Sequence, residues 1–303
     1  MTQTDLDVVT GAFGNTGRFI ARRLLDAGRQ VRTLTYRPTA DDPLASEVTA
    51  VPYRFDDAAA LEESLRGATT LYNTYWVRVS RGSQQADAVA NSAALFQAAA
   101  RAGVERIVHV SVMHPSLTST YPYFRRKAEV EAALAEVGVS CGIVRPALVF
   151  GPGNVLIDNI AWLLRRLPVF AVAGDGRYPV RPVHVDDVAR MCVDLGTRRD
   201  EAIVDAGGPE IFTFDEMVTT IRDAVGSRSR VIHLPAFAVE MAGRALGVVL
   251  RDVLTTGEEL RSTIDGLASS EGPTSAEIAF SEWARSHGDE LGRAYRRPSH
   301  NSR

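Results

Sequence analysis

A tyrosine and a lysine four positions apart have the residue types of a catalytic acid and its electrostatic partner. They are Tyr123 and Lys127, in the stretch YPYFRRKAEVEAAL at 121–134. In a helix this spacing puts both side chains on one face. A free tyrosine has a pKa of about 10, and a neighbouring ammonium group lowers that pKa toward the range useful for proton transfer. The same spacing also occurs between plain surface residues, so the pair needs support from the rest of the chain.

Three glycines could hold a phosphate group. The segment VVTGAFGNTGRFI carries Gly11, Gly14 and Gly17 between a predicted strand and a predicted helix. A tight turn there lets a pyrophosphate approach the backbone and the positive end of the helix. The pattern predicts a dinucleotide cofactor, with a turn that binds nothing as the alternative.

The residue that meets the adenosine ribose in such sites lies about 20 positions further on. Twenty after Gly17 is Arg37, in LTYRP. An acid there binds the 2′-hydroxyl of NAD, whereas an arginine accommodates the 2′-phosphate of NADP. Arg37 therefore favours NADP, with NAD and a solvated surface arginine as alternatives. Asp56 ends a third predicted strand, where it could accept a hydrogen bond from the adenine amino group.

The elements that position these residues alternate between short β-rich runs and helical patterns. Six predicted strands, the last being SCGIVRPALVFGPG at 140–153, indicate an α/β fold with a doubly wound parallel sheet of the Rossmann type. Proline and glycine then become frequent, which indicates a smaller C-terminal substrate lobe. The expected division is a cofactor domain at 1–150 with 183–206 returning to it, a lobe at 151–182 and 207–295, and a disordered tail at 296–303.

Composition excludes several classes of protein. The chain has 303 residues, 45% of them hydrophobic, and a formal net charge of -3, so neither nucleic acid nor an acidic membrane is expected as a partner. Cys141 and Cys192 lack metal-ligand spacing and predict reduced core thiols. With no signal peptide visible, a cytoplasmic protein is expected. The apolar run at 234–250 is interrupted by Glu240 and Arg244, which favours a helix with a charged stripe over membrane association.

Five motifs in order resemble one superfamily. They are TGAFGNTG, HVSV, YFRRK, GIVRPALVFGPGN and GDGRYPVRPVHVDDVAR, within about residues 5–205. Together they resemble the extended or atypical branch of the short-chain dehydrogenases/reductases, which includes NAD-dependent epimerases and dehydratases. Within it the chain is most similar to NmrA-like reductases and to the NADPH-binding accessory subunit of respiratory complex I.

The resemblance implies roles for particular residues. Tyr123 would exchange a proton with the substrate oxygen, Lys127 would tune that tyrosine and bind ribose hydroxyls, and Ser111 would hold the same oxygen. The implied cofactor contacts are Gly11, Phe13, Gly14, Asn15, Thr16, Gly17, Arg37, Asp56, Thr74, Lys127 and Pro146. The chain departs from the family at the asparagine of its proton relay, because Asn91 does not fall on that position.

A metal site is not expected. His184, Asp186 and Asp187 come too close together in sequence at a strand-to-helix junction, and the two acids are better suited to cap the helix that follows. The resemblance thus implies an NADP-dependent oxidoreductase or epimerase acting on a small carbonyl or alcohol. The alternative is a non-catalytic NADP(H)-binding sensor or assembly protein, and a homodimer is left open.

Overall fold

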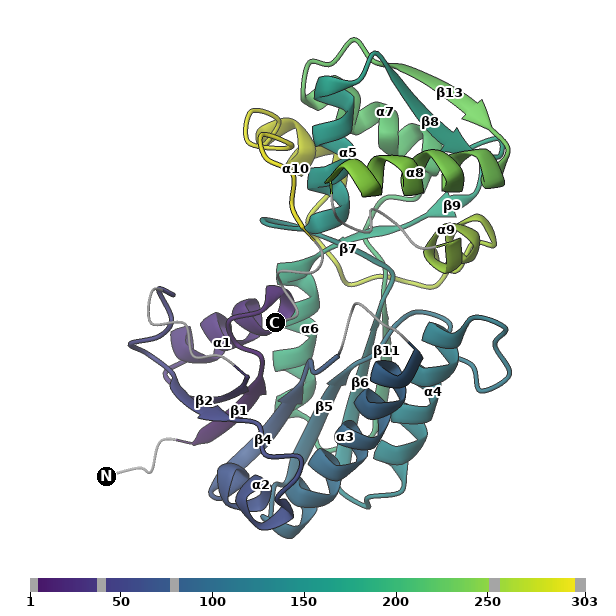
Figure 1. The fold of residues 1–303 in the computed structure, drawn as a ribbon. Coiled ribbons are helices and arrows are strands. Elements are labelled where there is room, and N and C mark those ends of the chain that lie inside the picture. The colour runs from purple at the N-terminus through teal and green to yellow at the C-terminus, as the bar shows by residue number, and fades with distance from the viewer. Residues whose placement is uncertain (1–4, 37–41, 77–81, 251–256, 298–303) are drawn as a thin grey trace. The chain divides into compact units, whose positions relative to one another are not determined.

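The computed structural model describes residues 5–36, 42–76, 82–250 and 257–297, and these form two compact units (Figure 1). The first contains residues 1–146 and 185–204, and the second contains residues 147–184 and 205–302. Each unit is described by itself.

The first unit is built on a seven-stranded sheet with the order β11-β6-β5-β4-β1-β2-β3. The pairs from β3 across to β6 are parallel. The predicted doubly wound α/β fold class is therefore confirmed. The strands are β1 Leu6–Thr10, β2 Gln30–Thr35, β3 Thr49–Pro52, β4 Ala68–Asn73, β5 Arg106–Val110, β6 Ser140–Pro146 and β11 Ala202–Ala206.

Helices cover both faces of this sheet. One pair packs together on one face, and three helices form a layer on the other (Figure 1). The pair is α1 Asn15–Asp26 and α6 Val185–Thr197; the layer is α2 Ala58–Leu65, α3 Gly82–Arg101 and α4 Pro122–Ala135. Val8, Leu71 and Ile107 of the sheet share one core cluster with Leu95 and Phe96 of α3. Burial of these apolar side chains is the main stabilising contribution.

The second unit has three two-stranded sheets and five helices among the described residues. Its strand pairs are β7 Leu148–Phe150 with β10 Pro182–His184, β8 Val169–Ala173 with β13 Arg230–Leu234, and β9 Pro179–Val180 with β12 Phe212–Thr213. Its helices are α5 Val155–Arg166, α7 Phe214–Ala224, α8 Ala236–Leu250, α9 Gly257–Ile264 and α10 Phe280–Ser286. Phe150, Ile157 and Trp283 belong to its core.

One predicted strand is wrong. The run at 140–153 does not form a single strand, because β6 ends at Pro146 and β7 pairs with β10 of the second unit. Between the two strands, the Ala147 N–H donates to the Ala206 carbonyl at 3.0 Å. Ala206 ends β11, the neighbour of β6 in the large sheet, so residue 147 still bonds to that sheet and the pairing with β10 begins at Leu148.

The apolar run at 234–250 is divided between two elements. Leu234 ends β13 and the helix α8 begins at Ala236. Glu240 accepts hydrogen bonds from Arg244 at 2.6 Å and from Arg261 at 3.5 Å. None of the helices in the described ranges is long and apolar enough to cross a bilayer.

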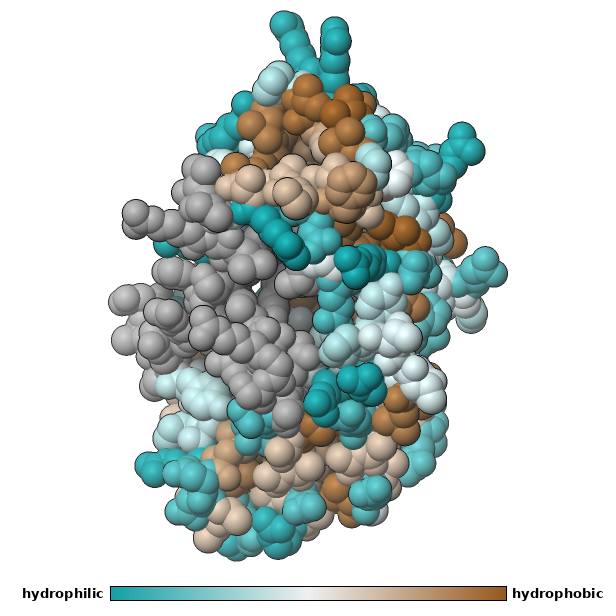
Figure 2. Space-filling model, turned by 45° about the vertical axis from the view of Figure 1, so that its right-hand side comes forward, coloured by the Kyte–Doolittle hydropathy of each residue, from teal (hydrophilic) through white to brown (hydrophobic). Residues whose placement is uncertain are grey.

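Exposed hydrophobic side chains gather on the second unit. In the upper part of Figure 2, where β8, β13 and α8 lie, the surface is largely hydrophobic. Phe237 and Met241, one helical turn apart on α8, are 70% and 64% exposed. The helix α8 therefore presents exposed apolar side chains in addition to the charged residues Glu240 and Arg244.

The two cysteines are free thiols. Cys192 of α6 is fully buried, whereas Cys141 of β6 is half-buried. Burial raises the pKa of both thiols, which keeps them in the unreactive protonated form.

The fold predicts a large effect from one methyl group in α1. A Cβ added at Gly17 would lie 2.3 Å from the Gly11 carbonyl oxygen, so Gly17→Ala must push the first turn of α1 away from the glycine turn. We expect the free energy of unfolding to fall by about 3 kcal/mol. The matched control is Gly243→Ala in α8, where nothing lies within 4 Å and the change should be neutral or slightly stabilising. Denaturant titration of both variants tests this, and equal stability would contradict the close packing described.

Candidate active site

The glycine turn lies at the carboxyl end of β1. Gly11 has a φ of 66°, a conformation that favours glycine, and its N–H donates to the Leu34 carbonyl at 2.9 Å. The Gly14 N–H donates back to the Gly11 carbonyl at 2.8 Å. Gly14 is the N-cap of α1, has no side chain with which to cap it, and is followed by no acid in the first turn. The positive end of this helix is therefore not neutralised by α1 or its cap, which favours an anion there.

The other predicted cofactor residues that the structure describes lie in several elements of the first unit. The Phe13 carbonyl accepts a hydrogen bond from Arg18 at 3.3 Å, and Thr74 is fastened to β1 by its N–H, which donates to Thr10 Oγ1 at 2.7 Å. Asn15 is exposed and Thr16 is half-buried in the first turn of α1. Asp56 is exposed in the turn before α2, and Pro146 ends β6. Arg37 lies outside the described residues.

Four aromatic rings lie where β2, β3 and β4 end. Tyr36, Tyr53, Phe55 and Tyr75 form a cluster in which Tyr53 stacks on Phe55 at a centroid distance of 5.0 Å. Tyr36 is nonetheless 60% exposed. Burial raises the pKa of the Tyr36 and Tyr53 phenols, so both are neutral at physiological pH. The cluster gathers aromatic rings at the ends of neighbouring strands, and sequence reasoning missed it because its members come from three separate strand ends.

Asn91 belongs to this aromatic cluster rather than to the predicted catalytic pair. Its side-chain amide donates to the Tyr75 hydroxyl at 3.0 Å, and that hydroxyl lies 3.3 Å from the Tyr36 hydroxyl. Asn91 was expected to lie away from the asparagine position of the family's proton relay. In the structure its side chain bonds to Tyr75 of the aromatic cluster.

Two of the predicted catalytic residues, Ser111 and Lys127, lie at the end of β5. Lys127 is 4% exposed, and its ammonium group donates to the Val110 carbonyl at 3.2 Å. Ser111 follows directly in the chain and is also 4% exposed; among the described residues its hydroxyl finds no hydrogen-bond partner. Tyr123 is half-buried one turn before Lys127 on α4. The structure therefore brings Lys127 and Ser111 to the same end of the same strand.

Trp76 connects the two members of the pair. The Lys127 ammonium lies over the Trp76 ring, 4.4 Å from its centroid. The Tyr123 ring meets the same tryptophan edge-on, with a centroid distance of 5.6 Å and an interplanar angle of 77°. One indole thus contacts both side chains.

Two opposing effects act on the pKa of Lys127. Burial lowers its pKa to about 7, and the carboxylate of Glu131 acts in the opposite sense. Glu131 is itself held by Arg145, whose guanidinium donates to both carboxylate oxygens at 3.0 and 2.5 Å. Lys127 therefore has a neighbouring negative charge that is largely compensated by another cation.

The amino-acid composition of the chain also draws attention to Lys127. Lys127 is the only lysine in the chain, so that 33 of the 34 lysines and arginines are arginines. A guanidinium stays charged at every physiological pH, whereas a buried ammonium shifts its pKa readily. The single lysine is thus found at a buried position where the type of cation matters.

His109 is a buried group that sequence reasoning missed. The Tyr75 N–H donates to Asn73 Oδ1 at 3.1 Å, which fixes the orientation of the asparagine amide. The amide nitrogen of Asn73 then donates to His109 Nδ1 at 3.1 Å, so the neutral ring carries its proton on Nε2. Burial and the nearby Lys127 lower the pKa of His109, which keeps the ring neutral. Thr10 Oγ1 lies 3.2 Å from the same Asn73 oxygen and joins this network to β1.

The acids at the start of α6 form ion pairs. Asp186 accepts two hydrogen bonds from Arg23 of α1, at 2.8 and 2.7 Å, and Asp187 accepts one from Arg190 at 2.8 Å. The His184 ring packs on Phe150 at a centroid distance of 5.1 Å. Across the described ranges, no three His, Cys, Asp or Glu side chains cluster as metal ligands would.

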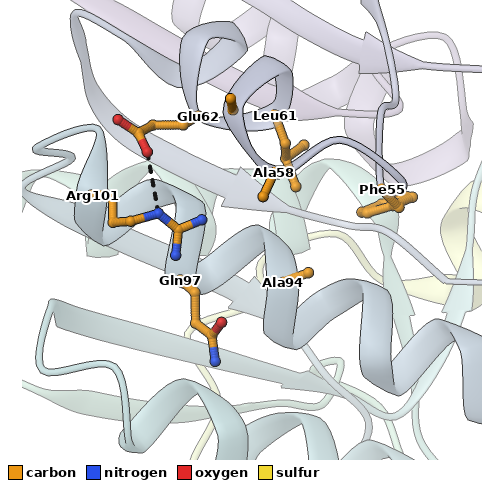
Figure 3. A pocket seen from close by; sticks show the side chains of 8 residues that line it. Phe55, Ala58, Leu61, Glu62, Ala94, Gln97 and Arg101 are labelled. Carbon is orange, nitrogen blue, oxygen red and sulfur yellow. Dashed lines mark hydrogen bonds and ion pairs between the residues drawn. The ribbon is translucent and has the colours of Figure 1, made fainter.

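A cavity of about 310 Å³ lies between α2 and α3 (Figure 3). Its charged side chains are Glu62 and Arg101, which are joined to each other at 3.1 Å, and much of the remaining lining is alanine. Because its two charges neutralise each other, this cavity offers little to a charged cofactor.

Comparisons with known proteins concern the family and the fold of this chain. The NmrA-like family matches residues 3–151. A Streptomyces griseus (4-alkanoyl-5-oxo-2,5-dihydrofuran-3-yl)methyl phosphate reductase is 29% identical over 299 residues, covering 93% of this chain and 98% of its own. Subunit 9 of the mitochondrial NADH dehydrogenase 1 alpha subcomplex of Arabidopsis thaliana is 26% identical over 242 residues, covering 75% of this chain and 60% of its own.

Two further comparisons concern length and fold. An uncharacterised Mycobacterium tuberculosis protein is 32% identical over 215 residues, or 70% of this chain, and the match spans only 23% of that protein's length. The crystal structure of the Citrobacter triphenylmethane reductase complexed with NADP(H) has a TM-score of 0.74 at 17% identity, covering 93% of this chain and 99% of its own. The resemblance seen in the sequence motifs is confirmed, and residues 3–151 of the chain belong to the NmrA-like family.

Proposed function

We propose that the protein is a nicotinamide-dependent oxidoreductase that reduces a carbonyl group, or oxidises an alcohol, of a small molecule. The observation that carries this proposal is the placement of Lys127. It is the only lysine of the chain, it is buried at the end of β5, and it lies next to Ser111 and one helical turn from Tyr123.

The residues present fit a dinucleotide cofactor. The uncapped start of α1 suits a pyrophosphate, and the Ser111 hydroxyl is a buried group that lacks a partner among the described residues. Gly11, Gly14 and Gly17 would lie against the pyrophosphate, and Lys127 would bind a ribose hydroxyl. The cofactor, when bound, supplies or accepts a hydride.

The chain's own residues would handle the proton. Tyr123 donates its phenolic proton to the substrate oxygen during reduction and takes it back during oxidation. Ser111 donates a hydrogen bond to that oxygen, and the positive charge of Lys127 favours the phenolate that Tyr123 becomes. The half-exposed position of Tyr123 and the buried position of Lys127 suit these different roles.

Reduction is favoured over epimerisation by the relatives. The Streptomyces griseus relative that spans nearly this whole chain is a reductase, and the Citrobacter reductase of similar fold was solved with NADP(H). A preference for NADP over NAD rests on Arg37.

A second candidate is a non-catalytic NADP(H)-binding subunit. It is favoured by the similarity to complex I subunit 9, which covers about three quarters of the chain in both Arabidopsis thaliana and Dictyostelium discoideum. Such a protein would bind NADPH tightly and leave it unchanged with every carbonyl compound offered.

Removal of one hydroxyl separates the two candidates. Tyr123→Phe keeps the ring on Trp76 and deletes only the proton donor, so turnover should fall by about 10²-fold while NADPH affinity stays nearly unchanged. The control is Tyr121→Phe, which removes a hydroxyl from a tyrosine that is not four residues from the lysine. Steady-state rates of NADPH oxidation over a carbonyl panel measure both. Full activity in Tyr123→Phe would show that another group supplies the proton.

Cofactor choice gives a second test. Arg37→Ala should weaken NADPH binding by roughly tenfold or more and change NADH binding little, because a charge-assisted contact to the 2′-phosphate is lost. Calorimetric dissociation constants for both cofactors, in parent and variant, provide the comparison. An equal loss for NADPH and NADH would exclude Arg37 as the selecting residue.

Lys127 gives a third test, based on pH. Its folded pKa of about 7 lies below its ordinary value of 10.5, so between these values the unfolded chain binds more protons and stability rises with pH. The destabilisation is complete below pH 7 and disappears toward pH 10.5. Lys127→Met should therefore raise the free energy of unfolding by roughly 2 kcal/mol at pH 6.5, with a smaller gain at pH 9.5.

The same variant should lose cofactor binding and turnover. A residue kept for stability would show the reverse, namely a destabilised Lys127→Met protein that still binds NADPH normally. Denaturant unfolding at the two pH values, together with NADPH titration, distinguishes these outcomes.

A further inference from the structure

Trp76 has no role in the proposed chemistry, yet it contacts both members of the catalytic pair. It follows β4 by three residues and packs partly buried against the core of the first unit. Its face lies against the ammonium of Lys127, and Tyr123 meets the same ring edge-on. The indole therefore touches two side chains that are neighbours on one face of α4.

The ring is a principal partner of the lysine charge. In the part of the chain that the structure describes, the ammonium group contacts the Val110 carbonyl and the Trp76 face, and no carboxylate pairs with it. The nearest acid on the same helix, Glu131, is bound by Arg145. A carbonyl oxygen and a ring face thus take the place of a salt bridge, and the indole is the strongest of the aromatic faces for a cation.

We infer that Trp76 is a positioning residue, which stabilises Lys127 as a cation and fixes it beside Tyr123. The part of this inference that concerns proton transfer rests on the proposed reductase function. The contact between ring and ammonium does not depend on that function.

Other charged groups around Lys127 do not supply this effect. Tyr123 and Glu131 come from its own helix, His109 lies on β5, and Arg145 on β6 is bound to Glu131. Burial lowers the pKa of His109 and keeps the ring neutral, and its nearness to Lys127 disfavours a second positive charge. Replacing Trp76 would leave Glu131, His109 and Arg145 unchanged and would remove the ring that contacts Lys127 and Tyr123.

The single lysine makes a direct measurement practical. Protein labelled with ¹³C-lysine gives one side-chain methylene signal next to the amine, because Lys127 is the only lysine in the chain. Its chemical shift, followed against pH in cofactor-free protein, reports the pKa of Lys127. We expect Trp76→Leu to lower that pKa by about one unit and Trp76→Phe to lower it by less.

A matched control removes a similar contact elsewhere. Arg166 lies over the Trp162 ring at 4.7 Å in the second unit, so Trp162→Leu deletes a tryptophan–cation contact and should leave the Lys127 titration unchanged. A tryptophan with a merely structural role would give no graded order of Trp, Phe and Leu. If the leucine variant unfolds, the phenylalanine variant still tests the order because it keeps an aromatic ring.

The outcomes separate this inference from the proposed function. An unchanged Lys127 titration in folded Trp76→Leu protein would overturn the role of Trp76, whether or not the protein is a reductase. If the pKa of Lys127 falls but the protein reduces no carbonyl compound, the contact between Trp76 and Lys127 is supported and the proposed reductase function is not. A lowered pKa together with a shifted pH profile of NADPH oxidation would support both.

Discussion

The close approach of Gly17 to the carbonyl of Gly11 is the constraint on which the first unit depends. No side chain fits between them, so the first turn of α1 lies directly on the turn that ends β1. Arg23, two turns later, holds the same helix to Asp186 of α6. With both contacts in place, α1 has one direction relative to the sheet, and its uncapped N–H groups stand at the carboxyl end of β1.

A second set of contacts carries this fixed geometry across the sheet. β1, β4 and β5 are neighbours in the strand order, and Thr10, Asn73 and His109 form a hydrogen-bonded line across their ends. Buried polar groups in such a line permit only one register, because a slip would leave donors and acceptors unpaired. Lys127 donates to Val110, the residue after His109, so the glycine turn and the lysine share one rigid frame.

Local sequence patterns predicted many of the helices and strands. Contacts between residues far apart in the chain explain the features that these patterns missed. The spacing of Phe19, Ile20, Leu24 and Leu25 predicts α1, and Gly28, with a φ of 76°, follows the end of that helix. The run at 140–153 is interrupted by Arg145 and Pro146, but it does not identify the partner of β7, because β10 lies more than 30 residues away. Trp76 and Lys127 are 51 positions apart, and no spacing rule joins a strand end to a helix face.

The surroundings of Lys127 suit a lysine better than an arginine, although both side chains carry a positive charge. Arg106 is also buried in the first unit, and its guanidinium needs the carbonyls of Leu195 and Asp200 and the hydroxyl of Ser140.

Even so, one nitrogen of Arg106 finds no partner within the described ranges. At Lys127 the surroundings provide one carbonyl and one ring, which satisfy a compact ammonium group but not the five N–H groups of a guanidinium. In a chain that otherwise uses only arginine as its strong base, the site accepts the smaller cation, and with it a charge that the neighbouring groups can adjust.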